Sequence, residues 1–159
     1  MQDLDFAIVD PHFHHWDPLT TPRAVSPFAR ALHRWPGVYA RVARLVMPQS
    51  VKDFVGGQSI LHPYLPDDYA RQAEGLGIDT VVHVEAGWVQ RGKFGVVGET
   101  RWLDQLDFAR SGRRLGAIVG HADLRRADVD AVLAAHQAAS KRLRGIRDKA
   151  ARHPDRGVM

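Results

Sequence analysis

Short apolar runs recur along the chain, and each is followed by a polar stretch with helix signals. The runs lie at residues 6–9, 80–84, 115–119 and 143–147. Runs of this length, rich in β-branched residues, are typical of buried strands in a parallel sheet. Because strands and helices alternate, the sequence predicts an α/β fold whose parallel strands are joined by helical crossovers.

The stretches between the expected strands predict five helices. They lie at residues 26–35, 38–47, 66 to 75 or 77, 99–110 and 127–140. Two of them begin with proline at the first helical position, where its fixed backbone angle suits a helix. Glycine or proline then breaks the chain near several of the expected ends.

Two closures of a parallel sheet agree with this order, an open doubly wound sheet and a (β/α)8 barrel. The first run is followed by Pro11-His12-Phe13-His14 and not by a glycine-rich phosphate loop, which argues against a dinucleotide site. A complete barrel needs about 250 residues, whereas this chain has 159. Four β/α units are half of such a barrel.

Two histidines, His12 and His14, follow the first expected strand two residues apart. Side chains at this spacing point to the same side of a strand, so both imidazoles can reach one point. Imidazole is the commonest protein ligand for zinc-like metals. The pair alone is weak evidence, because the chain holds nine histidines. His15 points the other way and is expected to be structural.

Polar side chains also end the next two expected strands. His83 and Glu85 share one side of the second strand, where the carboxylate can orient a histidine or contact a substrate. The alternative is a buried, hydrogen-bonded pair. His121 and Asp123 follow the third strand with the same two-residue spacing, and His121 is a candidate for lining a pocket.

Six segments resemble the amidohydrolase-related family, in the branch that contains sugar lactonases and pyrone-dicarboxylate lactonase. The first, at residues 8–18, reads Ile-Val-Asp-Pro-His-Phe-His-His-Trp-Asp-Pro. The others follow in the family's order and extend the resemblance over nearly the whole chain, at residues 64–69, 81–86, 98–103, 118–124 and 143–147. The resemblance implies a parallel (β/α)8 TIM-barrel fold of which residues 1–159 form about the first four β/α units, as part of one domain.

The same resemblance implies a hydrolase that cleaves a lactone, ester or amide of a small carboxylated or sugar-like substrate. His12 and His14 would bind a divalent metal, expected to be zinc, or polarise the substrate directly as in metal-independent lactonases. Arg147 would hold a substrate carboxylate in a bidentate fork, beside Glu85, His83 and His121. Decarboxylation also occurs among relatives. The family's catalytic aspartate would lie beyond residue 159, so the chain is expected to be a fragment without activity of its own.

Composition bears on the remaining classes of function. Cysteine is absent, which excludes disulfides and thiolate metal sites. No secretory signal or membrane-spanning apolar run is present, as in a cytosolic protein. The net charge is +4, but the basic residues are scattered, so a nucleic-acid partner is not expected. The alternative to an enzyme is an α/β module that forms a homo-oligomer or binds a partner through its open sheet edge.

Overall fold

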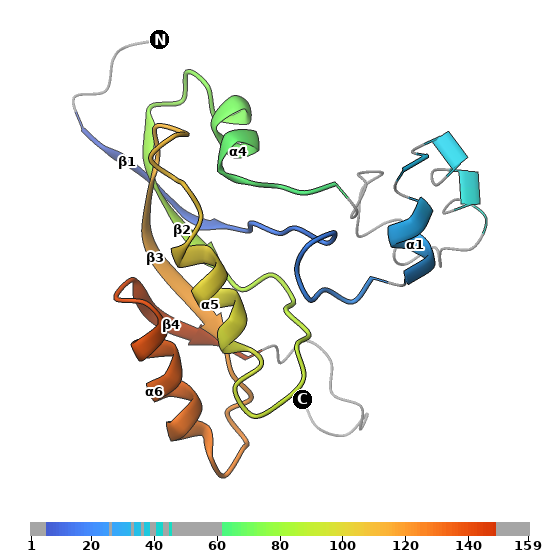
Figure 1. Ribbon diagram of the computed structural model, residues 1–159. Helices are drawn as coiled ribbons and strands as arrows, with labels where there is room; N and C mark the ends of the chain where they lie inside the picture. Colours follow the sequence, from blue (N-terminus) through green and yellow to red (C-terminus); the bar gives the residue numbers. More distant parts are fainter. Residues whose placement is uncertain are drawn as a thin grey trace.

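Four parallel strands form one sheet in the order β1-β2-β3-β4 (Figure 1). The computed structural model describes residues 6–25, 27–32, 34–35, 37–38, 41–42, 45 and 62–148. The strands are β1 Ile8–Phe13, β2 Ile78–Val84, β3 Arg114–His121 and β4 Leu143–Arg147. Each strand pairs in parallel with the next one along the chain, which confirms the predicted α/β fold with a parallel sheet.

Three strands are longer than their apolar runs predicted, and β2 already begins at Ile78. β1 continues through Asp10 and His12, and β3 continues to His121. Pairing between strands follows the backbone, so polar residues can extend a strand beyond its apolar part. His12 therefore lies within β1 and not after it.

The helices are α1 Pro27–Leu32, α4 Pro66–Gln72, α5 Val97–Asp104 and α6 Val129–Ala139. Of the five expected helices, the one at residues 38–47 lies largely outside the described residues. The others are present with shorter or shifted ends. Among the described helices, none is long and apolar enough to cross a membrane.

The largest error in the expected helices concerns α5, which ends at Asp104 and not near residue 110. After it, the Asp107 carboxylate accepts a hydrogen bond of 3.0 Å from the main-chain N–H of Arg110. Gly112 then adopts a positive φ of 68°. A short acidic side chain that bonds the backbone in this way favours a turn over a continued helix.

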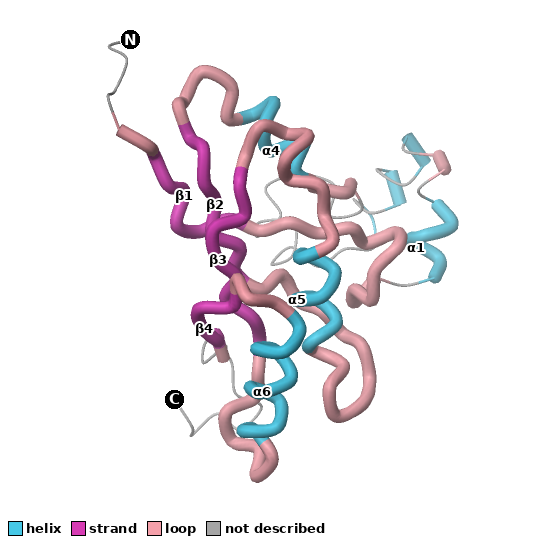
Figure 2. Tube along the Cα trace, turned by 60° about the vertical axis from the view of Figure 1, so that its left-hand side comes forward, coloured by secondary structure: helices cyan, strands magenta, loops and turns pink. Residues whose placement is uncertain are grey.

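Helices α4, α5 and α6 lie on the same side of the sheet (Figure 2). Tyr69 of α4 and Leu103 of α5 pack with Val81 and Ile118 of the central strands in one core cluster. A second cluster joins Val132 of α6 to residues of α5 and β4. Within the described part of the chain, no helix covers the opposite face of the sheet.

Gly120 of β3 lets helix α6 approach the sheet closely. A Cβ at this position would lie 3.0 Å from Cε1 of the buried His136. The His136 imidazole donates from Nε2 to the His121 carbonyl oxygen at 2.9 Å. It accepts at Nδ1 from the Thr100 hydroxyl at 2.8 Å. One imidazole thereby joins α5, α6 and the end of β3.

Truncation of the core side chain Leu103 should destabilise the protein strongly. Leu103 is fully buried between α5 and the sheet. Leu103→Ala should lower the free energy of unfolding by about 2–5 kcal/mol, because it removes buried methyl groups and leaves a cavity. Urea denaturation followed by circular dichroism measures this change. Leu124→Ala, at an exposed leucine, is the control, and an equal loss in both variants would contradict the assigned core.

Candidate functional site

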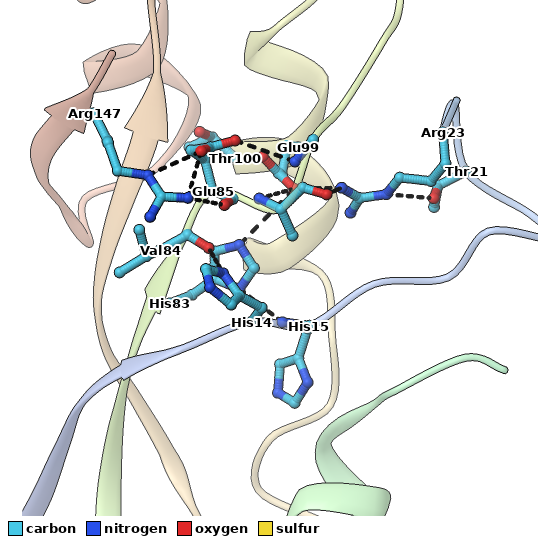
Figure 3. A network of polar contacts seen from close by, with 12 residues as sticks. His14, His15, Thr21, Arg23, His83, Val84, Glu85, Glu99, Thr100 and Arg147 are labelled. Carbon is cyan, nitrogen blue, oxygen red and sulfur yellow. Dashed lines mark hydrogen bonds and ion pairs between the residues drawn. The ribbon is translucent and has the colours of Figure 1, made fainter. Parts of the chain in front are cut away.

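The candidate site lies where the four parallel strands reach their carboxyl ends. Strand β1 contributes His12 and is followed by His14, β2 is followed by Glu85, β3 ends with His121, and β4 ends with Arg147. Because the strands are parallel, these ends lie at one edge of the sheet. Figure 3 shows how Arg147, Glu85 and His14 gather there. This is the edge at which parallel α/β sheets carry their ligand sites.

The His14 imidazole is held in one tautomer. Its Nδ1 lies 2.7 Å from the carbonyl oxygen of Val84, which can only accept a hydrogen bond. Nδ1 therefore carries the proton, and Nε2 keeps its lone pair. Burial lowers the pKa of His14, and the neighbouring His12 and Arg147 lower it further. The result is a neutral imidazole whose Nε2 is able to bind a metal or accept a proton.

The His12 ring lies next to His14, with ring centroids 5.1 Å apart and planes at 81°. His12 is exposed, and its main-chain N–H donates to the Asp10 carboxylate at 3.0 Å. The other oxygen of Asp10 accepts a hydrogen bond of 2.8 Å from the Tyr69 hydroxyl. The end of β1 is thus fixed by a helix of the core layer, and the predicted proximity of the two histidines is confirmed.

His121 is oriented in the same manner as His14. Its Nδ1 lies 3.0 Å from the Arg147 carbonyl oxygen on the neighbouring strand, so Nδ1 donates and Nε2 keeps its lone pair. Both histidines therefore use a main-chain carbonyl of the adjacent strand to fix the ring. A second hydrogen bond of this kind is how proteins orient imidazole ligands.

Arg147 and Glu85 bind each other. Arg147 donates to the Glu85 carboxylate from Nε at 2.9 Å and from Nη2 at 2.5 Å. Its Nη2 also donates to the Glu85 main-chain oxygen at 2.9 Å. The sequence predicted both residues at the site, but not this ion pair between them. Nη1 takes part in none of these three bonds, and a third of the Arg147 side chain is exposed. Its role in holding a substrate stays a prediction.

His83 differs from the other predicted site residues, because it is completely buried. Its ring packs against Phe13 at 5.9 Å, and its Nδ1 accepts the main-chain N–H of His15 at 3.1 Å. Burial lowers the pKa of His83 well below its usual value. The buried, hydrogen-bonded alternative therefore describes its surroundings, although the expected partner was Glu85. His15 is also buried, as its expected structural role predicts. Its Nδ1 donates a hydrogen bond of 2.9 Å to the main-chain carbonyl oxygen of Tyr64.

Two charged residues that the sequence did not single out lie behind the site (Figure 3). Arg23, from the segment after β1, forms a buried ion pair of 2.8 Å with Glu99 of α5. Burial raises the pKa of Glu99, while Arg23 opposes the shift. In the sequence, Glu99 has the appearance of an acid that suits the first turn of a helix. Nothing near Arg23 marks it as buried.

The described residues contain no group of three or more histidine, cysteine, aspartate or glutamate side chains arranged to hold a metal ion. His12 and His14 supply two imidazoles, whereas a catalytic zinc site normally has three protein ligands. Within the described residues, the two histidines therefore fall one ligand short of such a site.

The chain is similar to an uncharacterized protein of Sinorhizobium fredii, y4mH. The two are 30% identical over 155 residues, which make up 95% of this chain and 42% of that protein. The chain therefore spans less than half the length of this curated relative. No family model matches the chain, and no solved structure matches it.

The free energy of unfolding should decrease as the pH is lowered through the range in which these buried histidines titrate. Burial lowers the pKa of His15 from 6.5 to about 4, and it also lowers those of His14, His83 and His136. Above pH 6.5 each is neutral in both states and has no effect. As the pH falls from 6.5 to about 4, His15 binds a proton in the unfolded chain but not in the folded one, so it lowers the free energy of unfolding by up to about 1.4 kcal/mol per pH unit. The other three histidines act in the same direction.

Urea denaturation at several pH values measures this slope. His15→Gln should reduce it by about 1 kcal/mol per pH unit, because one titrating group is removed. His62→Gln, at an exposed histidine, should leave the slope unchanged. The same slope in His15→Gln and in the unaltered protein would mean that His15 is not held neutral by burial.

Proposed function

We propose that this chain forms the first four β/α units of a (β/α)8-barrel hydrolase of the amidohydrolase-related type. The sequential order of the strands supports this, because a doubly wound sheet reverses its order at a switch point. The position of α4, α5 and α6 on one side of the sheet supports it too, since a barrel carries its helices outside. The length of the rhizobial relative leaves room for the remaining units.

The observation that carries the proposal is the orientation of His14 beside His12. The Val84 carbonyl holds the Nδ1 proton of His14, and Nε2 is left with a lone pair at the carboxyl edge of the sheet. Neutral imidazoles of this kind suit a divalent metal, with zinc as the expected ion. His12 and His14 would hold such a metal, and the chemistry that it would supply is polarisation of a carbonyl and a bound water whose pKa is lowered toward about 7.

The remaining residues suit recognition of a small substrate. Arg147 places a partly exposed guanidinium at the same edge, and its Nη1 is directed to none of the bonds with Glu85. A guanidinium binds carboxylate or hydroxyl oxygens well. His121, with its lone pair on Nε2, is able to accept a hydrogen bond from the substrate. We infer a lactone, ester or amide with a carboxylate or several hydroxyl groups as the substrate class.

The open sheet edges favour a second candidate, a module that associates with another copy or with a partner protein. In the described sheet, β1 and β4 each pair on one side only. Val9 of β1 is half exposed, and Phe6 just before it is more exposed. Unpaired edges of this kind favour association. Light scattering after gel filtration tests this candidate, because a monomer at high concentration would argue against it.

Metal binding should depend on both histidines of the pair. His14→Asn should weaken the affinity for Zn²⁺ by at least about tenfold, because loss of an oriented ligand costs more than about 1.4 kcal/mol of binding free energy. His12→Asn should have a similar effect. Isothermal titration calorimetry with Zn²⁺ and with Co²⁺ measures both changes. His62→Asn is the control for binding at an exposed histidine, and equal weakening in all three variants would contradict a site at the end of β1.

A further inference from the structure

Arg23 and Glu99 form a polar cluster inside an aromatic enclosure. Both residues are buried, and their charged groups are 2.8 Å apart. The Arg23 guanidinium lies 5.4 Å from the ring centre of Trp88 and 5.7 Å from that of Trp102, close enough for cation–π interaction. Arg23 also donates from Nε to the Thr21 hydroxyl at 3.3 Å. The guanidinium therefore has a fixed position.

This cluster binds both polar groups of Ala86, the second residue after β2. The main-chain N–H of Ala86 donates to Glu99 Oε1 at 3.1 Å. Its carbonyl oxygen accepts a hydrogen bond from Arg23 Nη1, the same nitrogen that contacts Glu99. The backbone on either side of Ala86 is thereby tied to α5 and to the segment after β1.

The residue before Ala86 is Glu85, which reaches the candidate site. Its carboxylate accepts the two bonds from Arg147 and, at Oε2, the main-chain N–H of Gly87 at 3.1 Å. Gly87 has a φ of 79°, which a residue with a side chain rarely adopts. The tight turn at residues 85–87 is thus held by Arg147 on one side and by Arg23 and Glu99 on the other.

The ion pair is poorly suited to stabilising the fold in general. Among the described residues, Arg23 Nη2 and Glu99 Oε2 are buried without a hydrogen-bond partner. Burial of charged groups with incomplete bonding costs free energy that the attraction between them only partly offsets. Two apolar side chains of similar size would fill the same space beside Trp88 and Trp102 without burying charge. The pair is therefore better explained by what it positions than by what it adds to stability.

We propose that Arg23 and Glu99 are positioning residues that set the conformation of the 85–87 turn and, through Glu85, the orientation of Arg147 at the candidate site. The geometry of the turn stands by itself, but the importance of Arg147 for a substrate rests on the proposed function. The two residues act through main-chain groups and do not contact the substrate.

The double variant Arg23→Met/Glu99→Leu tests this proposal. It replaces both charges with apolar side chains of similar size, so the protein is expected to remain folded. Amide hydrogen exchange by NMR should become about tenfold faster at Ala86 and Gly87, because the variant removes the two side-chain hydrogen bonds that hold the Ala86 main chain. The Nε–H resonance of Arg147 should shift, since its partner Glu85 is no longer held in place.

Two comparisons separate positioning from a loss of overall stability. Arg114→Met/Asp79→Leu removes an ion pair at the opposite, amino end of the sheet and should leave Ala86, Gly87 and Arg147 unchanged. Urea denaturation reports the global stability of each variant. If the Arg23/Glu99 double variant does not fold, the same measurements are made on Glu99→Gln, in which a smaller change is expected at the same positions because the amide keeps one acceptor oxygen for Ala86 but loses the charge that attracts Arg23.

Each result has a definite meaning. Faster exchange confined to the turn, together with the shifted Arg147 resonance, supports the proposal. A uniform increase over all amides, or no change at the turn and at Arg147 in a folded variant, overturns it. Zn²⁺ titration of the unaltered protein is a separate test, so a failure to bind metal counts against the proposed hydrolase and leaves the positioning role standing.

Discussion

The contact between Glu85 and Arg147 is the interaction on which the candidate site depends. A buried carboxylate is costly unless it is paired and hydrogen-bonded, and Glu85 receives two bonds from Arg147 and one from Gly87. This pairing joins the ends of β2 and β4, two strands that have β3 between them. It also leaves Arg147 only partly exposed. The main-chain oxygen of Arg147 also accepts the hydrogen bond from His121, so this residue connects the ends of β2, β3 and β4.

The sequence predicted the architecture better than the details of the site. Apolar runs mark the strands because buried strands need them, and the strand ends therefore located His12, His14, His121 and Arg147. Contacts between distant segments leave no local pattern. Arg23 and Glu99 meet only after folding, because they are 76 positions apart in the sequence, and each by itself resembles a surface residue. The sequence also predicts His83 at the site, whereas the structure buries it completely. The alternation of side chains along a strand does not show how much of the strand the helices cover.

Under the proposed function, the described residues would supply part of a metal site and part of a substrate site, and these residues lie at one edge of the sheet. Two features of the described residues bear on this proposal: no three possible metal ligands lie together, and the sheet face opposite the helices has no described helix on it. Similarity to a protein of more than twice this length agrees with a site that other parts of a chain would complete. The proposed hydrolase and the proposed partner-binding module both require further strands or another chain at the open edges.

The hydrogen bonds of His14 and His121 connect ligand chemistry to the pairing of strands. Each imidazole is fixed by a carbonyl on the neighbouring strand, His14 by β2 and His121 by β4. A shift of one residue in the register would move that carbonyl and turn alternate side chains to the other face. In molecules with misaligned strands, no carbonyl would hold the proton on Nδ1, so the lone pair on Nε2 would not be fixed toward a ligand. Evolutionary selection for binding at this edge would act at the same time against misfolded forms of the sheet.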